Sequence, residues 1–187
     1  MILARRSARR SRGGFTLVEV IVAATVLVIG CLGLSGAITS SARLMELNRE
    51  RGLAHEAARA QLELLENTAF AEVFARFNAT AADDPAAGSS PGRNFAVAGL
   101  NSVRGDADGL PGEVIFPTVG NLGLQLTEAY ADARFRMPGD LNGDGVTKAG
   151  AMTGAYTVLP VRVRVRWRGP TGNSTLDLDT VLMDRTR

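Results

Sequence analysis

The chain of 187 residues contains one cysteine, Cys31, and one histidine, His55. A single cysteine excludes an intramolecular disulfide bond. One cysteine and one histidine also form no cluster of ligands that could hold a metal and activate water. The sequence has no phosphate-binding Gly-Lys loop either. The composition therefore predicts a protein that is not an enzyme.

Charge of one sign is missing from the N-terminus, and almost all charge is missing from the segment that follows. Residues 1–14 contain no acid, and they hold five of the 21 basic residues: Arg5, Arg6, Arg9, Arg10 and Arg12. From Phe15 to Ala42 the only charged side chain is Glu19. About 20 apolar residues cross a bilayer as a helix. The segment therefore predicts a transmembrane helix, and the arginines predict a cytoplasmic N-terminus.

The pair Gly13-Gly14 lies before the apolar run. An ordinary secretory signal has its small-residue cleavage site after the apolar core. Cleavage at the glycines would instead remove the arginines and leave the apolar helix on the mature chain. The order of these features favours an anchor with a short leader over a secretory signal.

The stretch GGFTLVEVIVAATVLVIGCLGLSG resembles the N-terminus of type IV prepilins and type II secretion pseudopilins. The resemblance covers residues 1–40, and VLVIGCLGLSGA most resembles the minor-pilin branch. It implies that prepilin peptidase cuts after Gly14 and that Phe15 becomes the methylated N-terminus. It also implies that Glu19 is the family's acid at the fifth mature position.

A physical reason for Glu19 exists apart from this resemblance. An ionised side chain deep in a bilayer costs roughly 2.5–3.5 kcal/mol and needs a partner. Cleavage after Gly14 creates an amine on Phe15, one helical turn before Glu19. The amine of the same chain or of a neighbouring subunit could pair with this acid, which the helix dipole also favours. The alternative is an acid near the membrane edge that reaches water by snorkelling.

Three glycines recur every third residue in the apolar run, at Gly30, Gly33 and Gly36. Small residues let membrane helices approach each other closely. The same glycines lower helix propensity, and the resemblance implies local unwinding on filament assembly. Close packing and unwinding both remain open interpretations.

Helical periodicity continues beyond Arg43 in a stripe of apolar side chains, with no proline before Pro85. We therefore predict one helix from Phe15 to about Phe77. Its domains are a leader at 1–14, a transmembrane or filament-core helix at 15–42 and an amphipathic continuation at 43–77. A linker loop at 78–93 and a β-rich head at 94–187 follow.

Short apolar runs in the head predict strands: NFAVAG from Asn94, EVIF from Glu113, LGLQL from Leu122 and VRVRVRWR from Val161. The last run and STLDLDTVLMD predict an antiparallel hairpin with a four-residue loop at 170–173. In that register Trp167 faces Leu176 and Val165 faces Leu178. Arg166 would face Asp177, and Arg164 would face Asp179.

Four arginines, Arg162, Arg164, Arg166 and Arg168, share one face of this hairpin. A DNA-binding stripe is one interpretation. Asp177 and Asp179 neutralise part of the stripe, and no aromatic side chain of the strand shares its face to stack on bases. A solvated sheet face is therefore favoured.

The stretch GDLNGDGVTKAGA matches the first half of an EF-hand-type calcium loop. Asp140, Asn142 and Asp144 would supply side-chain oxygens, and Val146 would supply a carbonyl oxygen. The second half departs from the pattern, because Lys148 and Ala151 stand at positions nine and twelve. Asp132 or the pair Asp106 and Asp108 could supply the missing acid. The alternative is a simple Gly/Asn/Asp turn without calcium.

The sequence thus predicts an α+β, pilin-like fold, with a long N-terminal helix packed on an antiparallel sheet. The resemblance implies a minor pilin or pseudopilin in a type IV pilus or type II secretion filament. Its partners would be prepilin peptidase, other pilin subunits and an inner-membrane assembly platform. The chain would reside in the bacterial inner membrane with its head outside the cytoplasm. The alternative function is a membrane-anchored, calcium-binding interaction module that does not polymerise.

Overall fold

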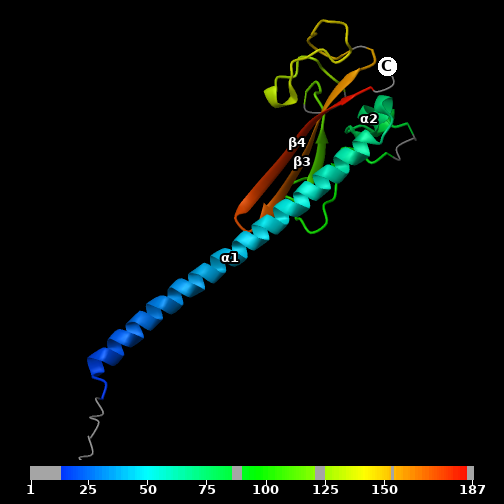
Figure 1. The fold of residues 1–187 in the computed structure, drawn as a ribbon. Helices are drawn as coiled ribbons and strands as arrows, with labels where there is room; N and C mark the ends of the chain where they lie inside the picture. Colours follow the sequence, from blue (N-terminus) through cyan, green and yellow to red (C-terminus); the bar gives the residue numbers. More distant parts are fainter. Residues whose placement is uncertain (1–13, 86–89, 121–124, 153, 185–187) are drawn as a thin grey trace, which may run out of the picture. The chain divides into compact units, whose positions relative to one another are not determined.

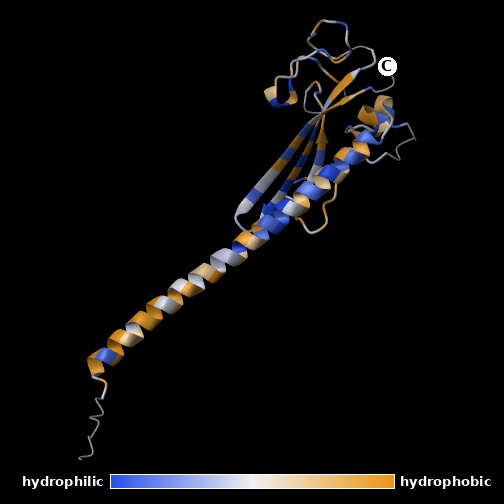
Figure 2. Ribbon diagram, viewed as in Figure 1, coloured by the Kyte–Doolittle hydropathy of each residue, from blue (hydrophilic) through white to orange (hydrophobic). Residues whose placement is uncertain are grey.

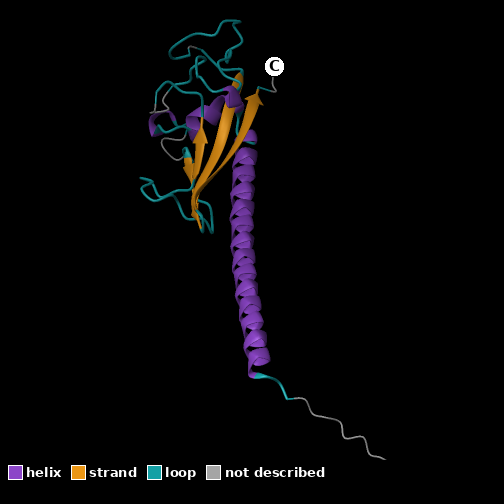
Figure 3. Ribbon diagram, turned by 90° about the vertical axis from the view of Figure 1, so that its left-hand side faces the viewer, coloured by secondary structure: helices purple, strands orange, loops and turns teal. Residues whose placement is uncertain are grey.

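The computed structural model describes residues 14–85, 90–120, 125–152 and 154–184. The chain forms two compact units, Met1–Leu44 and Met45–Arg187. The helices are α1 (Leu17–Glu66) and α2 (Phe70–Phe77), with 3-10 helices η1 (Ala81–Asp83) and η2 (Ala133–Phe135). One antiparallel sheet has the order β1 (Asn94–Phe95), β2 (Gly112–Ile115), β3 (Val158–Gly169) and β4 (Gly172–Met183) (Figures 1 and 3). This arrangement confirms the α+β, pilin-like prediction.

The predicted helix to Phe77 is wrong at its C-terminal end, because α1 ends at Glu66 and α2 begins at Phe70. The helix ends there: the amide of Thr68 donates to the carbonyl of Leu65, three residues back, at 3.2 Å, which replaces the regular helix bond to the fourth residue back. The break turns Phe77, which is 1% exposed, into the core.

The predicted strands before the hairpin are shorter than or shifted from the sequence pattern, whereas β3 extends beyond its predicted run. Only Asn94–Phe95 of the first run and Gly112–Ile115 around the second are strands. Residues 122–124 of the third run lie outside the described residues, and Leu126 makes a single bridge with Thr118. The two long strands β3 and β4 therefore form most of the sheet.

The hairpin of β3 and β4 exists, but its predicted register is wrong by two residues. The loop has two residues, so that Gly169 pairs with Gly172, Val165 with Leu176 and Arg164 with Asp177. Pro170 occupies the first central position, where its fixed φ suits a turn of type I or II. Gly172 has a φ of 115°, which L side chains rarely adopt. A shift by two keeps each side chain on its predicted face, since side chains alternate with a period of two.

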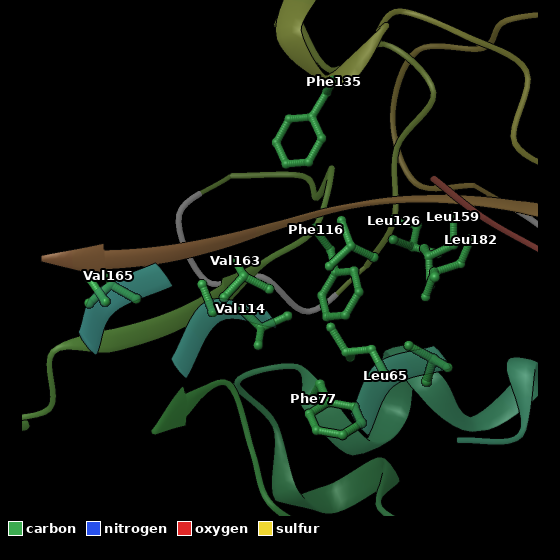
Figure 4. Packing of buried hydrophobic residues seen from close by; sticks show 14 of the residues in the cluster. Leu65, Phe77, Val114, Phe116, Leu126, Phe135, Leu159, Val163, Val165 and Leu182 are labelled. Atoms are coloured by element: carbon green, nitrogen blue, oxygen red, sulfur yellow. The ribbon is translucent and has the colours of Figure 1, made fainter. Parts of the chain in front are cut away.

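The core lies between the apolar face of the sheet and the helices (Figure 4). On β3, Leu159, Val161, Val163 and Val165 are fully buried. Helix α1 contributes small buried residues, among them Ala54 and Ala58, to the same core. Small side chains let a helix approach a sheet closely.

Glu50 is a buried acid on the face of α1 that packs against the sheet. Its carboxylate accepts a hydrogen bond from the Trp167 indole at 3.0 Å. A Cβ atom on Gly169 would lie 2.4 Å from the same carboxylate. The glycine at the end of β3 thus makes room for the acid that joins the strand to the helix.

The sequence predicted a solvated surface for the opposite face of β3, but part of this face is covered. Arg162 is 5% exposed, and its guanidinium lies 4.4 Å from the centre of the Phe135 ring. Figure 4 shows Phe135 on one side of the β3 ribbon, with Leu65 and Phe77 on the other. Residues 132–135 cover the sheet there, and a loop cover of this kind leaves no sign in the strand's own pattern.

Acids pair with the covered arginines. Arg162 donates to both carboxylate oxygens of Asp179 and, at 2.8 Å, to Asp132. Arg164 donates to Asp177 at 2.8 and 3.1 Å. The predicted pairing of arginines with Asp177 and Asp179 is therefore confirmed in kind, although each acid meets the arginine two residues earlier than expected.

We expect R162M to lower the free energy of unfolding by about 2 kcal/mol, because the partly exposed carboxylates of Asp132 and Asp179 lose their charged hydrogen bonds to a buried arginine. R168M is the matched control: Arg168 is exposed on the same strand, so its change should stay within about 0.5 kcal/mol. Denaturant unfolding of the full chain in detergent, followed through the single tryptophan, measures both. Equal losses in the two variants would contradict the importance of the buried network.

The same network predicts a dependence of stability on pH. The hydrogen bond from Arg162 lowers the pKa of Asp132 below its ordinary value of 3.8. The stability that ionised Asp132 contributes is therefore present above pH 3.8 and is lost as the pH falls through the lowered value. The melting temperature of the D132N variant should be below that of the wild type at pH 6, and the difference should close towards pH 2. A difference that is constant from pH 6 to pH 2 would contradict this assignment.

Candidate functional site

The first described residues form a capped helix start. Helix α1 begins at Leu17. The amide of Glu19 donates to the Thr16 hydroxyl at 3.3 Å, and the amide of Val20 donates to the Thr16 carbonyl at 3.2 Å. Thr16 is thus the N-cap, and Glu19 is the third helical residue, the position of the acid in a T-x-x-E capping-box pattern. The sequence analysis missed this role, although the four-residue spacing shows it.

The capping box places Glu19 where a carboxylate is compatible with the helix. The free amides and the dipole at a helix N-terminus favour a negative charge in the first turn. This stabilisation belongs to the helix alone and needs no second subunit. A partner is still needed to neutralise the carboxylate when the segment lies in hydrocarbon.

The stem, which we define as residues 15–44, is exposed along its whole length. Every residue from 14 to 44 is exposed, and the side chains of Phe15 and Leu17 are 80% and 77% exposed. Figure 2 shows that hydrophobic residues dominate this part of α1. Among the described helices, α1 is the one long and apolar enough to cross a membrane. Its apolar surface requires lipid or the apolar helices of other chains.

The polar side chains of the stem bond within the helix. Thr25 donates to the Ile21 carbonyl at 2.8 Å, and Thr39 donates to the Ser35 carbonyl at 2.9 Å. Such bonds satisfy hydroxyl groups that lipid could not. The stem can therefore enter a water-free environment with few unsatisfied polar groups apart from Glu19.

The glycines of the stem lie within unbroken helix. No atom lies within 4 Å of a Cβ built on Gly30, Gly33 or Gly36, so these positions are open on the helix surface. An open glycine lets a neighbouring helix come close. In the separate subunit this stretch is helical, and unwinding on assembly stays a prediction.

The predicted calcium ligands lie together in one loop. Asp140 accepts hydrogen bonds from the amides of Asn142, Gly143 and Gly145 at 3.1, 2.7 and 2.7 Å. Asp144 accepts from the Val146 amide at 2.9 Å. The loop thus has the tight turn that the D-x-N-x-D-G pattern predicts, with Gly145 at a φ of 82°.

None of the distant acids that the sequence offered joins this loop through a bond that the structure shows. Asp132 pairs with Arg162 at 2.8 Å, Asp106 lies 3.6 Å from Arg166, and Asp108 accepts from the Leu110 amide at 3.0 Å. The acid at the loop is instead Glu128, which lies twelve residues before Asp140 in the sequence. It is outside the D-x-N-x-D-G pattern, so the sequence pattern does not predict its position at the loop. Among the described residues, no group of three His, Cys, Asp or Glu side chains is placed to hold a metal. Calcium binding stays a prediction.

An apolar helix with a capped N-terminus and one acid in its first turn, followed by a small antiparallel sheet, fits a membrane-anchored α+β subunit. Residues 9–35 match the family model of the prokaryotic N-terminal methylation motif. A search of the curated proteins and a search of the solved structures gave no match. The N-terminal motif and the pilin-like fold both support a relationship to the type IV prepilins and pseudopilins.

We expect coexpression with a prepilin peptidase to remove residues 1–14 and to leave Phe15 with one added methyl group. Intact mass and N-terminal sequencing measure both changes. A G14V variant, with a branched side chain before the bond to be cut, should keep its leader, and so should the wild-type chain made without the peptidase. A cut after the apolar segment would contradict the assignment of Gly14 and Phe15.

Proposed function

We propose that this chain is a minor pilin or pseudopilin that is cut after Gly14 and inserted into a type IV pilus or type II secretion filament. The observation that carries the proposal is the stem, which is exposed along its length and, before Arg43, holds Glu19 as its only charge. A stem of this kind fits lipid before assembly and a bundle of similar helices after it. The methylation motif supports the same conclusion.

Glu19 would direct the insertion. After cleavage, the amine of Phe15 and the carboxylate of Glu19 are separated by one helical turn, so each subunit carries a positive and a negative group at one depth. An incoming stem can place its amine against the Glu19 of a neighbour only at one axial position. Pairing removes the cost of two isolated charges in hydrocarbon, and it would thereby set the register of the subunits.

The proposed location and partners follow from the same segment. Arg5 to Arg12 would hold the N-terminus in the cytoplasm, where prepilin peptidase would meet the leader. The inner-membrane assembly platform would then receive the mature stem, and the head would lie outside the cytoplasm. Other pilin or pseudopilin subunits would supply the helices that cover the stem.

A DNA-binding role for the head is not supported by its arginines. Arg162 and Arg164 are engaged by Asp179 and Asp177, and Arg166 lies 3.6 Å from Asp106. A phosphate would have to displace these acids from the guanidinium groups. Nonspecific DNA binding relies on free basic side chains along a groove.

The head sequence favours the minor branch over a typical major pilin, because a major pilin often carries a disulfide loop in its head and this chain has only Cys31. The stem is common to pili and secretion filaments and does not discriminate between them. The other function, an anchored calcium-binding module that does not polymerise, predicts an uncut leader and a calcium-dependent head.

We expect E19A to be processed normally but to fall in sheared filaments by roughly tenfold or more, because one lost ion pair leaves an amine unpaired in the stem bundle. E63A is the matched control, since Glu63 is an exposed acid on the same helix. Immunoblots of sheared and membrane fractions, with intact mass as the check on processing, measure the effect. Recovery of E19A equal to that of E63A would contradict the proposed role of Glu19.

A further inference from the structure

A polar pocket of about 580 Å³ lies beside the turn of the β3–β4 hairpin. Its lining includes four charged residues: Glu46 and Glu50 from α1, Arg104 from the loop between β1 and β2, and Arg168 from the end of β3. All four belong to the compact unit that begins at residue 45. The Arg168 amide donates to the Asn101 carbonyl at 2.9 Å, so a backbone hydrogen bond joins the loop to the strand at this pocket.

The two arginines of the pocket lack the acid partners that the other arginines of β3 have. Arg162, Arg164 and Arg166 each have a carboxylate oxygen at 3.6 Å or less. Arg104 and Arg168 are exposed, and neither makes a side-chain hydrogen bond or ion pair within the described parts of the chain. Their guanidinium groups therefore have free donors, which match the oxygens of a phosphate group.

The two acids of the pocket supply the opposite charge. The Glu50 carboxylate is 9% exposed and accepts a hydrogen bond from the Trp167 indole at 3.0 Å. Glu46 pairs with Arg49 at 2.9 Å, and 46% of its side chain stays exposed. Two acids and two arginines give the lining no net charge. A ligand of one sign would meet like charges there, whereas a ligand with separated charges of both signs would find a complement for each.

The pocket is close to the end of the apolar run along the chain. Leu44 and Met45 are exposed apolar residues that directly precede Glu46. The four residues from Ala42 to Glu46 span about 6 Å as a helix and at most about 14 Å as an extended chain. This limit holds for any arrangement of the two units. The headgroup region on each side of a bilayer is roughly 5–8 Å thick, so a stem that lies in the membrane brings the pocket to the lipid headgroups.

We propose that this pocket binds the headgroup of phosphatidylethanolamine, with the phosphate at Arg104 and Arg168 and the ammonium at Glu46 and Glu50. This headgroup carries one charge of each sign, and its primary ammonium can donate hydrogen bonds to a carboxylate. The quaternary ammonium of phosphatidylcholine has no such donor, and phosphatidylglycerol has no positive charge. The contact would hold the head at the membrane surface before assembly. It rests on the anchoring of the stem in a membrane, which both functions considered above share.

The first test measures lipid binding to the full chain in detergent by native mass spectrometry. Phosphatidylethanolamine, phosphatidylcholine and phosphatidylglycerol with identical acyl chains are titrated separately, so that the apolar stem contributes equally to each. The wild type should bind phosphatidylethanolamine roughly fivefold more tightly than either other lipid, the change expected for one net hydrogen bond. The double variant R104Q/R168Q should lose this preference.

The matched control is R59Q, because Arg59 is an exposed arginine of α1 that does not line the pocket. It should keep the preference of the wild type, and all variants should melt at the wild-type temperature. Equal binding of the three lipids by the wild type would overturn the proposal. So would tighter binding of phosphatidylglycerol, which would indicate simple attraction to an anionic surface. A preference that survives in R104Q/R168Q, or that R59Q loses equally, would also overturn it.

Soluble phosphoethanolamine distinguishes the lipid from a free ligand of the same chemistry. It should bind at least tenfold more weakly than the lipid, because a lipid that shares the micelle with the stem is held at a high effective concentration near the pocket. Equal affinity for the soluble compound would assign the pocket to a free ligand and overturn the lipid assignment.

A second readout uses the single tryptophan, which donates to the Glu50 carboxylate of the pocket. The full chain is placed in lipid nanodiscs that contain a lipid with a nitroxide on carbon 5 of one acyl chain, close to the headgroup. The phosphatidylethanolamine form should quench Trp167 more than the phosphatidylcholine form, and R104Q/R168Q should remove the difference. Equal quenching in the wild type would overturn the proposal. Neither readout depends on cleavage or filament assembly, so its failure is distinguishable from failure of the proposed function.

Discussion

The alternation of β3 is the constraint on which the head depends. Its apolar side chains, such as Val163 and Val165, face the core that α1 joins through Ala54 and Ala58. Arg162 and Arg164 face the other way, where Asp132 and the acids of β4 pair with them. One strand thus connects a helix packing on one side with an ionic network on the other. Glu50 and Trp167 join the strand to α1 near the hairpin turn.

The stem is governed by a different constraint, the lack of any cover for its apolar surface. Residues 15–44 make no core of their own, and exposing their apolar side chains to water is unfavourable. The helix satisfies the hydrogen-bonding groups of the backbone. The Thr25 hydroxyl donates to a preceding carbonyl, and the Thr16 hydroxyl accepts from an amide of the first turn. Glu19 is left as the one group that still requires a counter-charge. The proposed function supplies it from a neighbouring amine.

The loop after Asp140 shows how part of a motif can form a turn by itself. The spacing of the acids and the glycine produces the turn, because the side chains accept hydrogen bonds from the amides of the following residues. Outside the matched half of the motif, Lys148 pairs with Asp144, and Glu128 accepts a hydrogen bond from the Lys148 amide.

The sequence alone determined the features that depend on local order. These are the apolar stem with Glu19, the α+β class and the face of each residue in β3 and β4. Tertiary structure decided the rest. The hairpin register could not be read from alternation, since a shift by two residues preserves every face. Contacts between segments distant in sequence decide the cover on Arg162 and the approach of Glu128 to Lys148. The break at Thr68 depends on a choice between alternative local hydrogen bonds. A pattern of neighbouring residues contains no information on either.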